Sequence, residues 1–320
     1  AYTLWKTGYF KKDFYYKPFY SYPDSKAIYI SDDRESDLPK NTQASYGSAD
    51  MVYNVIDTRQ AYLQNLIAQI LSDLSDKTEV RNFSHFSYEM VALTQNCVNE
   101  MGFEISDDQK QKSYIEVSGR KGIAIKADEL IDRLKQKSLV EVEKRNQGAD
   151  PEEIDHIAEE IAIGALRYFM IKYNSNSVIA FDFDEVLSFE GDTGPYLQYT
   201  LVRINSILKK LDRSDQDVSI ESKDLEILGK DELSDYYNHL IQLSLLQNQV
   251  EFALESDEIS LIPNYAYAIC QKLNNYYHKY PILSEKNPEI KSLRIALLVM
   301  TKNRLETLYS IMGIPVPAKM

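Results

Sequence analysis

The sequence predicts an α/β region that is followed by an all-α helical bundle. Residues 51–57 form a buried-strand candidate, and residues 59–74 follow with the apolar spacing of a helix packed on that strand. A glycine-punctuated turn at residues 188–194 then opens a long amphipathic helix. Most of the strand-like sequence precedes this turn, and the sequence after it is helical.

Composition limits the classes of protein to consider. The chain has 320 residues, enough for two or three domains, and 44% of them are hydrophobic, as in ordinary globular proteins. It contains no run of 18 apolar residues and no signal-peptide pattern, so we expect no membrane span and a cytoplasmic location. Cys97 and Cys270 are far apart and no Cys-x-x-Cys occurs, which indicates neither a disulfide framework nor a cysteine zinc site.

Charge is distributed unevenly along the chain. The net charge of −13 argues against a protein that coats nucleic acid non-specifically. Residues 268–320 nevertheless carry eight Lys or Arg against three Glu, a local net charge of +5. This basic end indicates directed contact with a polyanion, with a chance fluctuation over a short segment as the alternative.

The N-terminal region is rich in tyrosine and phenylalanine, which crowd residues 9–22. Residues 24–48 are polar and are predicted to form a loop. We interpret residues 13–50 as an aromatic-rich surface insertion that packs against a neighbouring domain. Stacking of its rings on nucleic-acid bases is the alternative.

Two features of the α/β region suggest ligand binding. Ligands of parallel sheets bind beyond the carboxyl ends of the strands, so we expect Asp57, Thr58 and Arg59 near a pocket. Further strands are predicted around residues 89–93 and 114–117. Residues 118–122, directly after the second of these, set two cations between glycines, a composition that can hold a phosphate chain but also occurs in ordinary turns.

Residues 123–172 are predicted to be helical, and Asp150 and Pro151 form a helix start within them. In the later turn, Gly191 suits a positive φ and Pro195 suits the first position of a helix. We expect capping oxygens there from Asp192 and Thr193.

The helix that follows, over residues 195–211, has one apolar face and another that carries Tyr199 and Arg203. Residues 210–260 carry thirteen acidic and four basic residues, which we interpret as a solvated connection. Further helices of the bundle are predicted over residues 236–254, 263–279 and 293–312.

Three stretches resemble one family. Residues 181–203 resemble, almost residue for residue, the junction that leads into the anticodon-binding domain of arginyl-tRNA synthetases. Residues 118–122 and 277–320 look like the same family. The resemblance covers most of the chain after residue 51 and is weak over residues 13–50.

The resemblance implies three parts. Residues 1–125 would be the C-terminal half of a class I catalytic domain, an incomplete nucleotide-binding fold that carries the insertion at 13–50. Residues 126–180 would be a helical stem-contact region, and residues 181–320 an all-α anticodon-binding domain.

The resemblance also implies site residues in the glycine-bracketed loop. Lys121 and Arg120 would take the catalytic role of the class I Lys-Met-Ser-Lys-Ser loop, whose cations stabilise the ATP triphosphate during adenylate formation. Ser118, Gly119 and Gly122 would bind ATP beside them. The loop departs from the consensus sequence, so which cation dominates stays open.

Four residues of the bundle are implied to bind tRNA: Tyr199, Arg203, Tyr277 and Met320. Unstacked loop bases are gripped by aromatic rings and guanidinium planes, which suits the first three. Packing of the two tyrosines into the bundle core is the alternative.

The implied activity is that of an arginine-tRNA ligase in protein biosynthesis, which adenylates arginine with ATP and Mg²⁺ and transfers it to tRNA(Arg). Its partners would be tRNA(Arg), arginine and ATP, and we expect a monomer. This sequence indicates no metal ligands.

The family's His-Ile-Gly-His signature is missing, since none of the four histidines, His85, His156, His239 and His278, lies in that pattern. The first residues resemble the second half of the synthetase fold. We therefore expect the C-terminal portion of a larger synthetase, inactive alone. A non-catalytic tRNA-binding module is the alternative.

A more remote alternative is a haloacid dehalogenase-like phosphatase. Residues 178–186 resemble its Asp-x-Asp strand, where Asp182 and Asp184 would hold Mg²⁺ and attack phosphorus. That chemistry needs a second acidic pair and a lysine on later parallel strands, but only helices are predicted after residue 186.

Overall fold

The computed structural model describes residues 2–10, 13–32, 46–74, 82–117, 125–212 and 221–320. The chain divides into two compact units, Ala1–Glu89 and Met90–Met320. The described residues 90–117 therefore group with the helical parts that follow them, while the boundaries expected after residues 125 and 180 stay predictions.

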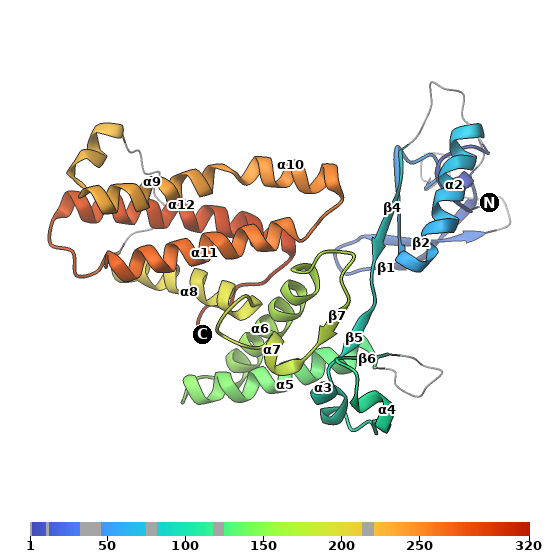
Figure 1. The fold of residues 1–320 in the computed structure, drawn as a ribbon, viewed down its shortest axis with the longest axis horizontal. Helices are drawn as coiled ribbons and strands as arrows, with labels where there is room; N and C mark the ends of the chain where they lie inside the picture. Colours follow the sequence, from blue (N-terminus) through green and yellow to red (C-terminus); the bar gives the residue numbers. More distant parts are fainter. Residues whose placement is uncertain (1, 11–12, 33–45, 75–81, 118–124, 213–220) are drawn as a thin grey trace. The chain divides into compact units, whose positions relative to one another are not determined.

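The first unit holds two small sheets (Figure 1). Its described elements are α1 (Tyr2–Lys6), β1 (Tyr15–Ser21), β2 (Ala27–Asp32), β3 (Met51–Asp57), the 3-10 helix η2 (Thr58–Gln60), α2 (Ala61–Leu74) and β4 (Asn82–Tyr88). β1 and β2 pair antiparallel, whereas β3 and β4 pair parallel from Met51 opposite Asn82 to Asp57 opposite Tyr88. The loop predicted over residues 24–48 is therefore wrong for residues 27–32, where Ile28, Tyr29 and Ile30 are strand-forming residues and lie in β2.

The predicted order of a strand and a helix at residues 51–74 is confirmed, but the predicted burial is wrong. Val55 of β3 is 65% exposed and Leu63 of α2 is 50% exposed, because few described residues cover these faces.

Asp13 ties the aromatic-rich segment together. Its Oδ1 accepts hydrogen bonds from Trp5 Nε1 at 2.8 Å and from the Tyr16 hydroxyl at 2.7 Å. Tyr16 is buried, but Phe19 is 70% exposed, and the rings of Phe14, Tyr20 and Tyr22 are exposed as well. Packing of this segment against a neighbouring domain stays a prediction.

The second unit begins with a short three-stranded sheet in the order β6-β5-β7. Its first elements are β5 (Val91–Leu93), α3 (Gln95–Glu100), α4 (Asp107–Lys110), β6 (Ile115–Glu116), α5 (Ala127–Arg145), α6 (Pro151–Ile171), β7 (Ile179–Phe181) and α7 (Phe183–Val186). The predicted helical segment is confirmed as an α5–α6 hairpin, and Asp150 caps α6 by accepting from the Glu152 amide.

The strand proposed for the phosphatase alternative ends at Phe181. Asp182 caps α7 by accepting from the amides of Asp184 and Glu185, and it also accepts from the Thr94 hydroxyl at 2.6 Å. Asp184 pairs with Lys137 at 2.7 Å. Beyond α7, the described residues form helices and turns without a strand, so they lack the later strands that this phosphatase chemistry needs.

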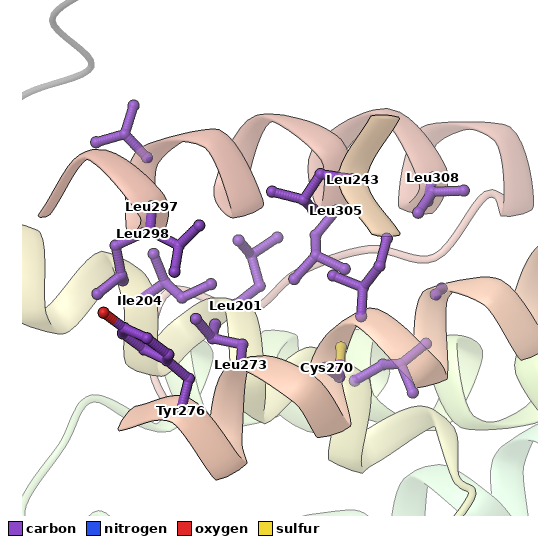
Figure 2. Packing of buried hydrophobic residues seen from close by; sticks show 14 of the residues in the cluster. Leu201, Ile204, Leu243, Cys270, Leu273, Tyr276, Leu297, Leu298, Leu305 and Leu308 are labelled. Carbon is purple, nitrogen blue, oxygen red and sulfur yellow. The ribbon is translucent and has the colours of Figure 1, made fainter. Parts of the chain in front are cut away.

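The rest of the unit is the helical bundle (Figure 1). It contains α8 (Gly194–Lys210), the 3-10 helix η4 (Ser222–Ile227), α9 (Lys230–Ser244), α10 (Leu246–Ser256), α11 (Leu261–Lys279) and α12 (Pro288–Met312). Figure 2 shows Leu201 and Ile204 of α8 lying among Leu273 of α11 and Leu297 and Leu298 of α12, which are all buried.

Two predictions for the bundle need correction. The helix expected over residues 236–254 is two helices, α9 and α10, separated at Leu245. The solvated connection expected over residues 210–260 is wrong for residues 222–256, which form η4, α9 and α10. Charge alone misled this interpretation, because Leu225, Leu228 and Tyr236 of the acidic segment are buried in the core.

None of the helices in the described ranges is both long and apolar enough to cross a membrane.

Candidate nucleic-acid interface

The turn before α8 is held by side chains from α6. Gly191 has a φ of +82°, which favours glycine, and Thr193 caps the helix by accepting from the Tyr196 amide at 3.3 Å. The predicted capping role of Asp192 is wrong. Its carboxylate accepts from the buried Tyr168 hydroxyl, and its backbone carbonyl accepts from Lys172 Nζ at 2.9 Å.

α6 and α8 pack closely because glycines lie at their crossing. A Cβ added to Gly194 would lie 2.7 Å from the Ala165 Cα and from the Gly164 carbonyl oxygen. Next to this contact, the fully buried Gln198 donates from Nε2 to the backbone oxygens of Glu160 at 2.9 Å and Pro315 at 2.7 Å. The start of α8 is therefore fixed against α6 and against the chain that follows α12.

This anchoring positions Tyr199 and Arg203, which lie one turn apart on α8. Tyr199 is 40% exposed. The Arg203 guanidinium lies over the ring of Tyr277 on α11, with Cζ 4.4 Å from the ring centroid, a cation–π contact. Arg203 of α8 and Tyr277 of α11 therefore meet, and Tyr199 lies one turn before Arg203 on α8. Their role in tRNA binding stays a prediction.

A small recess opens beside this pair. Its lining residues come from α8, α11 and α12: Thr200, Arg203, Ile204, Ile207, Leu273, Asn274, Tyr277 and Leu298. The Asn274 amide donates to the Tyr196 hydroxyl at 2.8 Å and to Thr200 Oγ1 at 3.2 Å, so its orientation is fixed. Burial raises the pKa of the Tyr196 hydroxyl above its ordinary value. The recess thus joins an apolar floor to an amide, a guanidinium and an aromatic ring.

The sequence reasoning missed Asn274 and Thr200. Both could have been found from helical spacing, because Asn274 precedes Tyr277 by three residues and Thr200 precedes Arg203 by three. Each therefore shares a helix face with a residue that was predicted.

Met320 lies elsewhere. It packs on a separate cluster of α5 and α6 that includes Val142, Ile157 and Ile161, and the adjacent Lys319 pairs with Glu153 at 3.0 Å. Within the described ranges, Met320 is not among the residues that line the recess beside Arg203 and Tyr277. The C-terminal residues fasten the bundle to the α5–α6 hairpin.

The basic character of residues 268–320 is partly neutralised in space. Lys279 pairs with Asp235 at 2.9 Å, and Arg294 pairs with Glu232 and Glu285 at 2.6 and 2.8 Å. Two of these acidic partners, Asp235 and Glu232, lie in α9, within the acidic stretch of residues 210–260. A simple count of charge along the chain therefore overstates the positive potential of this end.

At the end of β3, Asp57 and Arg59 engage each other. Arg59 Nε and Nη2 donate to the Asp57 carboxylate at 2.8 and 2.7 Å, and these bonds lower the pKa of Asp57 to about 2. Thr58 donates to Glu89 at 2.6 Å. The three residues lie at the carboxyl end of the strand, as predicted, but the pocket expected beside them stays a prediction.

The glycine-bracketed loop lies outside the described residues, and so do its predicted site residues Ser118, Gly119, Arg120, Lys121 and Gly122.

Comparison with models of protein families finds a match for the C-terminal part of the second unit. Residues 197–320 match the family model of the DALR anticodon binding domain. The match contains Tyr199, Arg203 and Tyr277, and it also contains every lining residue of the recess.

Curated relatives match the whole chain. Proteins from Thermococcus sibiricus and Thermococcus kodakarensis, both named arginine–tRNA ligase, are 30% identical to it over 100% of its length. The alignments cover 46% of each relative, so the chain spans about half the length of the curated relatives it matches.

Solved structures show the same fold. The arginyl-tRNA synthetase of Thermus thermophilus matches 100% of this chain and 48% of its own, with a TM-score of 0.76 and 24% identity. The arginyl-tRNA synthetase of Plasmodium falciparum matches 95% of this chain with a TM-score of 0.59 and 19% identity.

Proposed function

We propose that this chain belongs to the arginyl-tRNA synthetase family, that it corresponds to the C-terminal portion of its members, and that it binds tRNA(Arg) for an arginine–tRNA ligase. The proposed site is the surface made by Tyr199, Arg203 and Tyr277 with the adjacent recess. In the ligase, arginine would be adenylated with ATP and then transferred to the 3′ end of the tRNA.

One observation carries this proposal: an arginine side chain and a tyrosine ring from different helices pair at the rim of a recess inside the DALR match. Single-stranded loop bases are recognised by stacking on aromatic rings or guanidinium planes and by hydrogen bonds to their edges. Tyr199 and the Arg203–Tyr277 pair offer the stacking surfaces, while Thr200 and Asn274 offer polar atoms at the recess.

The exposure of Tyr199 favours binding over core packing. A tyrosine that only filled the core would be covered, as Tyr168 and Tyr236 are at 0% exposure, whereas Tyr199 is 40% exposed. Tyr277 is half-buried, because it packs against the bundle core and Arg203 lies on its ring, and we propose that the pair acts as one stacking surface. For Met320, the contact with α5 and α6 supports a structural role beside the proposed one in tRNA binding.

The catalytic contribution of this chain is proposed from sequence. We propose that Lys121 and Arg120 contact the ATP phosphates and that Ser118, Gly119 and Gly122 shape the loop around them. Clusters of three or more His, Cys, Asp or Glu suited to a metal ion are absent from the described ranges.

A non-catalytic tRNA-binding module is the second candidate. It is favoured by the missing histidine signature, because none of the four histidines lies in a His-Ile-Gly-His pattern. The two candidates share the tRNA surface and differ only in whether the chain takes part in adenylation. We also propose a cytoplasmic, monomeric protein, as is typical of the family.

The shared claim is tested by binding of the purified 320-residue chain to anticodon stem-loops. We expect it to bind a tRNA(Arg) stem-loop more tightly than one with an altered anticodon, with affinity falling as salt rises because phosphates are contacted. Equal affinity for both stem-loops would contradict recognition of the anticodon.

A further inference from the structure

Tyr276 precedes Tyr277 on α11 and points into the core of the bundle (Figure 2). It is 3% exposed, and its hydroxyl donates to Glu232 Oε1 at 2.9 Å. Within one turn of α11, Tyr276 therefore contacts a buried carboxylate on α9, and Tyr277 contributes to the lining of the recess.

Glu232 is itself fixed by Arg294 of α12. Arg294 Nε and Nη2 donate to the two oxygens of Glu232 at 2.6 and 2.9 Å, and both residues are less than 10% exposed, at 6% and 8%. Two parallel hydrogen bonds set the plane of the guanidinium as well as its distance. The remaining nitrogen, Nη1, donates to the Pro281 carbonyl at 2.9 Å and pairs with Glu285 at 2.8 Å.

These contacts join α9, α12 and the connection after α11 around the last turns of α11. The same turns supply Leu273, Asn274 and Tyr277 to the recess. A buried ion pair contributes little net stability compared with apolar packing, but removing one partner is costly, so such pairs hold a geometry. The buried network and the recess therefore share the last turns of α11.

We propose that Tyr276, Glu232 and Arg294 are positioning residues for anticodon recognition. They fix the end of α11 so that Tyr277 and Asn274 meet a base in one orientation. The network thereby sets discrimination between anticodons, while phosphate contacts made elsewhere supply affinity that is common to all of them. This inference rests on the proposed tRNA binding.

The test is Tyr276→Phe in the 320-residue chain, which removes one hydroxyl and keeps the ring. Tyr265→Phe is the matched control: Tyr265 is a buried tyrosine three turns earlier on α11, and its hydroxyl donates to the Gln242 carbonyl at 2.5 Å. Dissociation constants are measured for the cognate and an altered-anticodon stem-loop at two salt concentrations, together with the melting temperature.

The discrimination ratio is the dissociation constant of the altered-anticodon stem-loop divided by that of the cognate one. We expect this ratio to fall by about twofold to tenfold in Tyr276→Phe, the range of a single lost hydrogen bond. The salt dependence should stay unchanged, and the ratio should stay at the wild-type value in Tyr265→Phe even if both variants melt earlier. Glu232→Gln, which weakens the same contact from α9, should lower the ratio as well.

A proportional loss of affinity for both stem-loops, or an unchanged ratio in both network variants, overturns the inference. If the inference is overturned but Tyr277→Ala weakens binding in the same assay, the proposed tRNA binding still stands. If the wild-type chain itself fails to discriminate, the proposed function fails first.

Discussion

His239 is a buried histidine on the inner side of α9. It is 1% exposed, its Nε2 lies 2.8 Å from Thr301 Oγ1, and its Nδ1 has no hydrogen-bond partner within the described ranges. Burial, with a smaller effect of the nearby Lys272 charge, lowers the pKa of His239 to about 4. The folded bundle therefore holds this imidazole neutral.

We predict that this histidine makes the bundle sensitive to acid. The folded pKa lies below the unfolded value of about 6.5, so the unfolded chain binds the proton first and the free energy of unfolding falls as pH drops from 6.5 towards 4. Between pH 7 and 4.5 the loss from His239 should reach about 2 to 3 kcal/mol. Denaturant unfolding of wild type and His239→Gln at both pH values checks this, and identical pH dependence in the two would contradict it.

Lys121 gives a second prediction at the scale of one residue. In a full-length synthetase that contains this chain, Lys121→Ala should slow arginyl-adenylate formation by about 10²-fold, because charge on the transferring phosphates grows in the transition state. The affinity for tRNA should not change. Lys126→Ala is the control, since Lys126 lies just beyond the loop with an 80% exposed side chain. An unchanged adenylation rate with weaker tRNA binding would assign Lys121 to the RNA.

At the scale of elements, the crossing of α6 and α8 determines where Tyr199 and Arg203 lie. We predict that Gly194→Ala destabilises the fold by about 1 to 3 kcal/mol, because the new Cβ meets backbone atoms of Gly164 and Ala165 that cannot move aside easily. Gly229→Ala is the matched control, since a Cβ there meets nothing within 4 Å and its φ is −59°. Denaturant unfolding of both variants measures the difference, and equal stability would show that the helices separate at little cost.

Element types could be predicted where periodicity and capping agree. Pro151 and Pro195 mark helix starts that the structure confirms, and Gly313 ends α12 with a φ of +65°. The division of residues 230–256 into α9 and α10 could not be predicted, because the break at Leu245 carries neither glycine nor proline. The burial of Glu232 depends on Arg294, 62 residues away, which no local pattern indicates.

The candidate site could be predicted only one helix at a time. Spacing placed Tyr199 and Arg203 on one polar face, but the contact of Arg203 with Tyr277 depends on how α8 and α11 pack. Likewise, Asp192 and Thr193 are equally good capping residues by sequence, and the reach of Tyr168 from α6 decides between them.

At the scale of the whole molecule, the chain spans about half the length of the relatives it matches, at 46%. Its sequence holds the proposed phosphate loop and the anticodon-binding match but not the histidine signature. We predict that the purified 320-residue chain forms no arginyl-adenylate, because single donors to transition-state charge are each worth about 10²-fold or more. Arginine-dependent pyrophosphate exchange above a no-enzyme control would contradict this.

The central claim is that Tyr199 and the Arg203–Tyr277 pair bind the anticodon loop of tRNA(Arg). It is tested most directly by the affinity of a cognate stem-loop for the wild-type chain, Tyr199→Ala and Tyr237→Ala. Tyr237 is the matched control, a tyrosine on α9 with 42% exposure against 40% for Tyr199.

A lost base stack costs about 1 to 3 kcal/mol, so we expect Tyr199→Ala to bind the stem-loop about fivefold to a hundredfold more weakly. Tyr237→Ala should bind like wild type, and all three proteins should keep the same helical circular dichroism. Equal affinity of wild type and Tyr199→Ala, or an equal loss in Tyr237→Ala, would contradict the assignment of this surface.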